Sequence, residues 1–152
     1  MRTRMWISAG LSFTVLVTGC SRPATLPAAP MDPRTKAILA TLPAAYQGAD
    51  LENGQSKLAL CKACHTLAQG EHAAAGPNLW GVFGRKAGSA PGFDYSNGMK
   101  TLNVTWDAEH LNTWTTRPNA MVPGTKMSYI GMEDAKDRLD LIAALKVATT
   151  SR

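Results

Sequence analysis

Three stretches of the chain have the residue pattern of helices. The first, residues 51–61, leads directly into a pair of cysteines. The second begins at Asp107, a favourable N-cap residue, and ends before Pro118. The third begins near Asp134, whose negative charge suits the positive end of a helix. Its apolar positions recur at helical spacing at Ala135, Leu139, Ile142 and Leu145.

Residues 70–104, between the first two helices, show no convincing period and are rich in glycine, with Pro77 and Pro91. This composition predicts loops with short turns. So long an irregular segment normally argues against a compact domain, unless a bound cofactor supplies the missing core. The sequence shows no alternating pattern typical of strands and no internal repeat that would favour another fold class. We therefore expect an all-α fold of about three to five helices with long loops.

The N-terminal residues have the layout of a bacterial export signal. Two arginines precede an apolar stretch, residues 6–17, which is shorter than the about 20 apolar residues of a membrane span. The run Val17-Thr18-Gly19-Cys20 then resembles a lipobox, whose cysteine is acylated and becomes the new N-terminus. We expect residues 1–19 to be a lipoprotein signal peptide and Cys20 to carry lipid. A signal cut elsewhere and an uncleaved anchor are the alternatives.

Residues 20–45 are rich in proline and alanine. Such segments favour extended polyproline conformations and act as semi-rigid spacers, so we expect a linker that lifts the domain from a lipid surface. Within it, residues 35–42 are compatible with a short helix. The folded domain is then expected to span residues 46–150.

Composition and charge narrow the possible functions. With 152 residues, of which 45% are hydrophobic and 18% charged, the chain has room for one ordinary globular domain. The formal net charge is +5, but residues 49–150 contain equal numbers of basic and acidic residues, so the excess lies outside this stretch. No basic stripe with interleaved aromatic residues is present, which argues against nucleic-acid binding.

The run Cys61-Lys62-Ala63-Cys64-His65 is the pentapeptide of c-type haem attachment. Two thiols three positions apart can reach the two vinyl groups of one haem as thioethers, and the adjacent imidazole can bind the iron. A thioredoxin-like pair needs a βαβ pattern, and a zinc site needs two further ligands at knuckle spacing. The sequence shows neither. The motif therefore predicts one haem c, bonded to Cys61 and Cys64 and ligated by His65.

The iron then needs a sixth ligand or an open position, and this choice separates an electron carrier from a catalyst. The candidates are Met99, Met121, Met127, Met132, His72 and His110. Met127 stands out because Pro123 and Gly124 precede it, in a loop able to turn a side chain inward. A methionine is more often core filler, and we expect the two histidines at the surface. His/Met ligation would raise the haem potential, which suits electron transfer.

Beyond the pentapeptide, several motifs resemble those of class I cytochromes c, close to the mitochondrial and alphaproteobacterial type. The resemblance covers residues 61–148. The matching motifs are Gly76-Pro77-Asn78-Leu79, Gly81-Val82-Phe83-Gly84-Arg85-Lys86, Gly92-Phe93-Asp94-Tyr95, Trp106, Pro123-Gly124-Thr125-Lys126-Met127 and Asp140-Leu141-Ile142-Ala143. The resemblance implies the class I cytochrome c fold, wrapped round one covalently bound haem, for residues 46–150.

The resemblance also implies roles for individual residues. Met127 becomes the distal axial ligand, and the carbonyl of Pro77 accepts a hydrogen bond from the His65 imidazole, which orients it. The side chains implied at the haem propionates are Tyr95, Trp106 and Arg85 for the inner one and Thr125 for the other. Tyr129 stands where the family usually has a Phe against the haem face, and Trp114 replaces a common Tyr near the Met sulfur.

Two further departures from the family concern packing and charge. Lys57 or Leu58, together with Ala144, replaces an aromatic pair between the first and last helices of the family fold. Most of the family's lysines around the haem edge are also missing, which predicts a weak electrostatic steering field. Their positions are taken by Leu60, Asn119, Glu133 and Asp134, while Lys126 remains.

These features together predict an electron-transfer protein rather than an enzyme. We expect a monomeric one-electron carrier, lipid-anchored on the periplasmic side of a bacterial membrane, between a cytochrome bc-type complex and a terminal oxidase or another redox enzyme. The alternatives are an electron-accepting subunit of a dehydrogenase complex and a small haem peroxidase or gas sensor. Ser21, rather than Asp, after Cys20 mildly favours the outer membrane.

Overall fold

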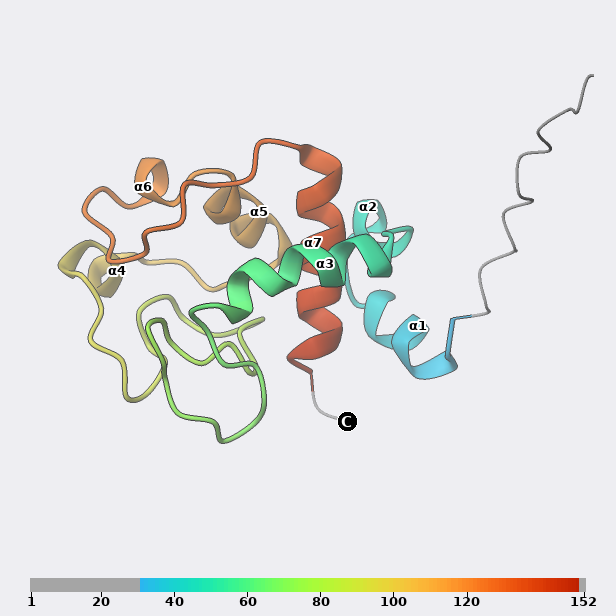
Figure 1. Ribbon diagram of the computed structural model, residues 1–152, viewed down its shortest axis with the longest axis horizontal. Helices are drawn as coiled ribbons and strands as arrows, with labels where there is room; N and C mark the ends of the chain where they lie inside the picture. The colour runs from blue at the N-terminus through green and yellow to red at the C-terminus, as the bar shows by residue number, and fades with distance from the viewer. Residues whose placement is uncertain (1–30, 151–152) are drawn as a thin grey trace, which may run out of the picture. The chain divides into compact units, whose positions relative to one another are not determined.

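The computed structural model describes residues 31–150, which belong to one compact unit. The expected signal peptide and Cys20 lie outside the described residues. Within them the structure has seven helices and no strand, apart from one isolated bridge between Lys86 and Thr105 (Figure 1). The helices are α1 (Pro33–Leu39), α2 (Ala44–Gln47), α3 (Leu51–Lys62), α4 (Asn97–Thr101), α5 (Ala108–Thr116), α6 (Pro118–Met121) and α7 (Ala135–Ala148). The all-α prediction is confirmed.

The number of helices exceeds the three to five that the sequence pattern predicted. Four of the seven have only four to seven residues, which is too short to show a helical period. The three long helices lie where they were predicted. α5 begins after Asp107, whose carboxylate accepts a hydrogen bond from the backbone N–H of His110 at 2.8 Å. α7 begins after Asp134, which caps the N–H of Asp137 at 2.8 Å.

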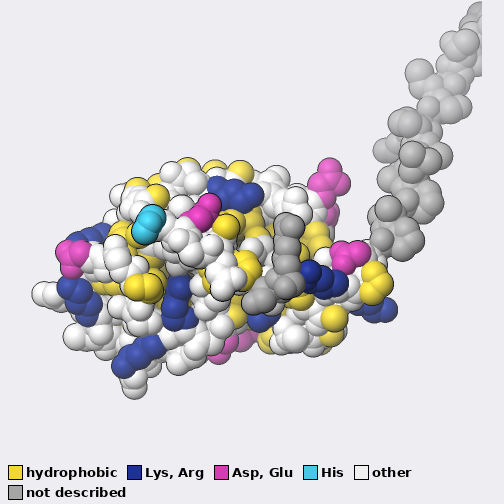
Figure 2. Space-filling view, turned by 90° about the horizontal axis from the view of Figure 1, so that it is seen from below, with side chains coloured by type: hydrophobic (Ala, Val, Ile, Leu, Met, Phe, Trp, Pro, Cys, Tyr) yellow, Lys and Arg dark blue, Asp and Glu magenta, His cyan; other side chains and the backbone are white. Residues whose placement is uncertain are grey.

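The surface of the described residues carries both signs of charge. Lys and Arg side chains are interspersed with Asp and Glu side chains over the face that Figure 2 shows. This mixture agrees with the equal numbers of basic and acidic residues in residues 49–150. Among the described helices, none combines the length and the apolar character that crossing a bilayer requires.

The two N-terminal helices belong to the folded unit. α1 and α2 both pack against α7, and Leu39 and Leu42 are buried in the core. Tyr46, on α2, is also buried, and its hydroxyl donates a hydrogen bond to the backbone carbonyl of Ala108 at 3.2 Å. The apolar side chains of this segment therefore contribute to the same core as the three long helices.

Residues 31–45, the part of the expected linker that the structure describes, contain α1 and the beginning of α2. Pro33 stands at the first position of α1, where a proline has no backbone hydrogen bond to lose, and Asp32 caps the same helix. Pro43 directly precedes α2. In the described part of this segment, Pro33 and Pro43 thus stand at the beginnings of helices rather than in an extended spacer.

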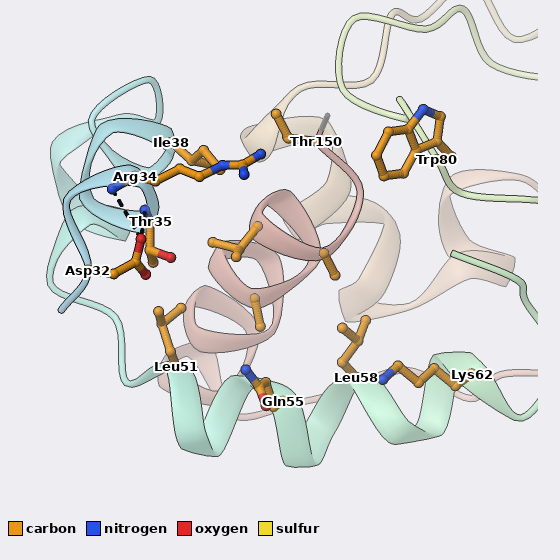
Figure 3. A pocket seen from close by; sticks show the side chains of 13 residues that line it. Asp32, Arg34, Thr35, Ile38, Leu51, Gln55, Leu58, Lys62, Trp80 and Thr150 are labelled. Carbon is orange, nitrogen blue, oxygen red and sulfur yellow. Dashed lines mark hydrogen bonds between the residues drawn. The ribbon is translucent and has the colours of Figure 1, made fainter. Parts of the chain in front are cut away.

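A hollow of about 510 Å³ lies between α1, α3 and α7 (Figure 3). Ile38 of α1, Leu51 of α3 and Trp80 line it, together with Leu58 and Ala144. Lys57 or Leu58, together with Ala144, was expected in place of an aromatic pair, and Leu58 and Ala144 are both buried. Because both side chains are small, space remains beside the contact between α3 and α7.

The crossing of α3 and α7 organises the fold (Figure 1). Gly54 lies at the point of closest approach and is buried. A Cβ atom at this position would overlap the backbone carbonyl of Asp140 and would lie 2.9 Å from the Cβ of Ala144. Glycine at residue 54 therefore allows the two helix backbones to approach more closely than any side chain would permit.

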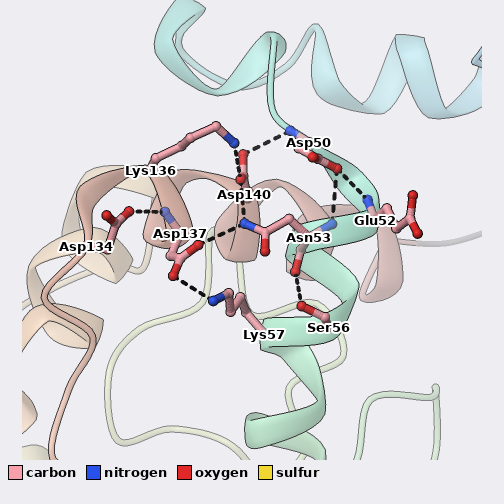
Figure 4. Close-up of polar contacts among 9 residues, drawn as sticks. All are labelled: Asp50, Glu52, Asn53, Ser56, Lys57, Asp134, Lys136, Asp137 and Asp140. Carbon is pink, nitrogen blue, oxygen red and sulfur yellow. Dashed lines mark hydrogen bonds and ion pairs between the residues drawn. The ribbon is translucent and has the colours of Figure 1, made fainter. Parts of the chain in front are cut away.

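A cluster of polar side chains joins the same two helices (Figure 4). Asp140 of α7 is 1% exposed. Its carboxylate accepts hydrogen bonds from the backbone N–H of Asp50 at 2.9 Å, from Asn53 Nδ2 at 2.8 Å and from Lys136 Nζ at 2.6 Å. Asn53 Nδ2 also donates to Asp137 at 2.9 Å. The buried charge is thus fully paired, as a carboxylate in a core must be.

We expect acid to weaken this cluster. Burial acts to raise the pKa of Asp140, but the hydrogen bonds from Lys136, Asn53 and Asp50 outweigh it, so the pKa is lowered below 3.8. A carboxyl whose pKa is lower in the folded state stabilises the fold above pH about 4 and loses this contribution as pH falls through the folded-state pKa. Asp140→Asn should lower the unfolding free energy at pH 7 by about 2 kcal/mol.

Urea unfolding of wild-type and variant protein at pH 7, 5 and 3 measures this effect. The difference between the two proteins should shrink toward pH 3, because the wild-type carboxylate begins to take up its proton there. Glu52→Gln, on an exposed position of α3, is the control and should unfold like wild type at each pH. A difference that stays constant across the pH range would contradict the role given to the Asp140 charge.

Candidate haem-binding site

The cysteine pair lies at the C-terminal end of α3. Cys61 is in the last turn of the helix, and the backbone N–H groups of Cys64 and His65 donate to its carbonyl at 3.0 and 2.9 Å. Both cysteines are free thiols; Cys61 is half-buried and Cys64 is exposed. Burial raises the pKa of Cys61 to about 11, so this thiol is protonated at neutral pH. The helix end therefore presents two thiols and an imidazole within one turn of chain.

His65 is held by the loop that follows. Its Nδ1–H donates to the backbone carbonyl of Pro77 at 2.7 Å, because a carbonyl oxygen can only accept. This hydrogen bond fixes the tautomer and leaves the lone pair on Nε2. Burial lowers the pKa of His65, so the imidazole is neutral at pH 7. Gly76 makes room for the ring, since a Cβ at this position would overlap its atoms.

Further hydrogen bonds keep the Pro77 carbonyl in place. The backbone N–H of Gly76 donates to the carbonyl of Cys64 at 2.8 Å. Asn78 Nδ2 donates to Thr66 Oγ1 at 2.9 Å and to the carbonyl of Ala68 at 3.0 Å. The residue before Pro77 is thus tied to the residue before His65, and the residue after Pro77 is tied to the chain that follows His65, which orients the imidazole through its partner.

A cavity of about 400 Å³ opens beside these groups, within the usual size range of a cofactor pocket. The structure places every haem-site residue expected from the sequence along its wall. These residues are Cys61, Cys64, His65, Pro77, Arg85, Tyr95, Trp106, Trp114, Thr125, Met127 and Tyr129. They come from α3, α5 and the loops between the helices, so the fold collects into one cavity residues that lie as many as 68 positions apart.

Reasoning from individual residues missed much of the apolar wall. The additional lining side chains include Leu79, Val82, Phe93, Leu111, Leu141, Ile142 and Leu145. Ile142 and Leu145 belong to the apolar positions that predicted the last helix. Leu79, Val82 and Phe93 lie in loops with no hydrophobic period, and only the motifs that contain them pointed to them.

The loop before Met127 turns sharply enough to direct this residue into the cavity. Gly124 has a φ of +73°, a conformation that favours glycine. The N–H of Thr125 donates to the carbonyl of Val122 at 3.1 Å, and Thr125 Oγ1 lies 3.3 Å from the N–H of Met127. Met127 is half-buried and lines the cavity together with His65.

The other candidates for the sixth ligand are separated by their positions. Met99, on α4, is buried and also lines the cavity. Met121 and Met132 do not line it, and neither do His72 and His110. His72 is exposed, as expected, and His110 is half-exposed beside Asp107, with which its Nδ1 pairs at 2.8 Å. Two methionines therefore border the cavity, on different elements.

The polar groups of the cavity wall suit an anionic ligand. The guanidinium of Arg85 donates to the carbonyls of Asn78 at 2.9 Å and Trp80 at 3.0 Å, which orients it although it is half-buried. Burial raises the pKa of Tyr95, and the nearby positive charge of Arg85 opposes this shift. The Trp106 and Trp114 rings lie 5.7 Å apart between centroids. A cation, a phenol and indoles thus share one wall.

These residues fit a haem c. Two nearby thiols can form the thioethers, a neutral and oriented imidazole can bind iron, and a methionine sulfur is available from another loop of the same cavity. The apolar wall suits the porphyrin faces, while Arg85 and the hydroxyl groups of Tyr95 and Thr125 suit its two carboxylates.

Comparisons with known proteins agree with this site. No family model matches the chain. The chain is 42% identical over 101 residues to cytochrome c2 of Rhodomicrobium vannielii, covering 66% of this chain and 81% of that protein. It is 45% identical over 83 residues to cytochrome c of Euglena viridis, and the match covers 55% of this chain and 80% of that protein. Cytochrome cH from Methylobacterium extorquens matches in structure with a TM-score of 0.60 and 42% identity, over 65% of this chain and 99% of that one. The chain therefore belongs to the class I c-type cytochromes, electron-transfer proteins with one covalently attached haem c.

Proposed function

We propose that this cytochrome is a His65/Met127-ligated one-electron carrier of a periplasmic respiratory chain, between a cytochrome bc-type complex and a terminal oxidase or another redox enzyme. The observation that carries the proposal is the shared cavity: His65 and Met127 line it from two different segments, so the imidazole and the sulfur could both serve as ligands of a haem iron bound there. When bound, haem c supplies a one-electron couple between ferric and ferrous iron.

The protein's own residues orient the His65 imidazole and set the reduction potential of the haem. The hydrogen bond from His65 to the Pro77 carbonyl holds the imidazole in one orientation, ready to bind iron through Nε2. The buried side chains of Leu141, Ile142 and Leu145 exclude water from the cavity and lower the local dielectric constant. A neutral sulfur ligand and an apolar surrounding both favour the less charged ferrous state, which gives a high potential.

The location is part of the proposal. The relatives from bacteria and the N-terminal export signal support a periplasmic site of action, with Cys20 as the acylated residue. Acyl chains stabilise membrane attachment by about 0.8 kcal/mol per buried methylene, so a multiply acylated Cys20 would anchor the protein firmly. We infer a monomer that reaches its partners by lateral diffusion along the membrane.

The rim of the cavity suits partners with a weakly charged face. Leu60 is 58% exposed and Ile130 is 89% exposed. Leu60 itself lines the cavity, and Ile130 follows Tyr129, which lines it. Lys126, on the same rim, is already paired with Asp94 at 2.6 Å. The mixed charges of Figure 2 agree with a weak steering field, which matters less for a carrier held at the membrane.

A visible absorption spectrum of the reduced, detergent-solubilised protein, with and without carbon monoxide, tests the proposal. We expect no change within minutes, because Met127 closes the iron. A fast and complete spectral shift would instead show an open or labile site and would favour a peroxidase or a gas sensor. Electron delivery from a bc-type complex to an oxidase in membranes that lack this protein tests the partners. Unaffected delivery in them would reject the respiratory assignment.

A further inference from the structure

The residue next to Met127 is attached to a distant part of the chain. Lys126 Nζ donates to the carboxylate of Asp94 at 2.6 Å and to the backbone carbonyl of the same residue at 2.7 Å. The two residues are 32 positions apart. The other carboxylate oxygen of Asp94 accepts a hydrogen bond from Lys100 Nζ at 2.9 Å. Asp94 therefore holds one cation from the Met127 loop and one from α4.

This attachment is the main polar link of the Met127 loop. Among the hydrogen bonds of the described residues, only those of Lys126 join residues 123–131 to another part of the chain. The other bonds of the loop, such as that of Thr125 to Val122, are local. At its C-terminal end the loop passes close to the backbone of Thr116. A Cβ atom added at Gly131 would overlap the carbonyl of Thr116.

The ion pair between Lys126 and Asp94 is expected to affect the opening of the Met127 loop more than the stability of the whole domain. The Lys126 and Asp94 side chains are 50% and 77% exposed, so their ion pair adds little to the stability of the whole domain. Met127 and Tyr129 also pack against the core, but a loop with so few hydrogen bonds to the rest of the chain opens by local fluctuation rather than by global unfolding. A bond at the position next to the ligand therefore acts mainly on the fraction of time for which Met127 points into the cavity.

We propose that Asp94 is a positioning residue that keeps the Met127 loop closed over the site by holding Lys126. The inference rests on the proposed role of Met127 as axial ligand. The backbone carbonyl of Asp94 orients the ammonium group, and the carboxylate supplies the charge-assisted bond. Lys100 completes the pairing of Asp94 and makes no hydrogen bond or ion pair with residues 123–131 in the part of the chain that the structure describes, so it offers a matched control.

Variants of the haem-loaded protein test the proposal. They are Asp94→Asn, Lys126→Met, the control Lys100→Met and the conservative variant Asp94→Glu. We expect amide hydrogen exchange in residues 123–131 to rise about two- to fivefold in the first two variants. The rate of carbon monoxide binding to the ferrous protein should rise by a similar factor. Lys100→Met should match wild type in both measurements. Asp94→Glu, which keeps the charge, should restore part of the closure.

Equal changes in Asp94→Asn and Lys100→Met would overturn the proposal, because they would show a general effect of surface charge. No change in loop exchange in Lys126→Met would overturn it as well. The failure of the proposed function is distinguishable: if wild type binds carbon monoxide fast and completely, Met127 is not a firm ligand. Hydrogen exchange would then still report whether Asp94 restrains the loop.

Discussion

Replacement of Met127 by Ala is expected to lower the midpoint potential by on the order of 100 mV or more, because axial ligands set haem potentials over a range of about 0.8 V. Loss of the sulfur would remove the proposed sixth ligand, which favours ferrous iron, and would leave a position for water or an added gas. The variant should therefore bind carbon monoxide within the mixing time of the experiment, while wild type does not.

Met99→Leu is the matched control, because Met99 is the second methionine along the cavity and leucine has a similar volume. Potentiometric titration of the three proteins, followed by visible absorption, measures the effect. We expect Met99→Leu to titrate close to wild type. If Met99→Leu lowered the midpoint potential and Met127→Ala left it unchanged, the sixth ligand would be on α4 rather than in the loop of residues 123–131.

Gly54→Ala is expected to lower the unfolding free energy by on the order of 3 kcal/mol, at the upper end of the usual cost of overpacking. The added methyl group would overlap the backbone carbonyl of Asp140, and a backbone atom cannot rotate away as a side chain can. The helices α3 and α7 would have to separate, which would also stretch the hydrogen bonds from Asn53 and Asp50 to Asp140.

Gly48→Ala is the control for this substitution. Gly48 has a φ of −95° at the end of α2, and nothing lies within 4 Å of a Cβ built there. Guanidinium unfolding of both variants, followed by circular dichroism, should show a lower unfolding free energy for Gly54→Ala and almost the wild-type value for Gly48→Ala. Equal stability of the two variants would mean that α3 and α7 can shift apart at little cost.

The sequence by itself determined the features that depend on neighbouring residues. The three long helices were predicted because their caps and apolar periods are local: Asp107 and Asp134 each bond an N–H three residues ahead. The haem attachment motif is also local, since one turn of chain carries both thiols and the imidazole. The remaining site residues were identified through family motifs, and the structure places all of them along one cavity.

Only the tertiary structure decided the features that depend on distant partners. The helices α1 and α2 form in a proline-rich segment because Leu39 and Leu42 find a core to enter on α7, and burial outweighs the weak local preference. Asp140 is charged and yet buried because Asn53, Lys136 and the backbone of Asp50 converge on it. The pairing of Lys126 with Asp94 likewise exists only once the chain has folded, because 32 residues separate them and no local pattern specifies their contact.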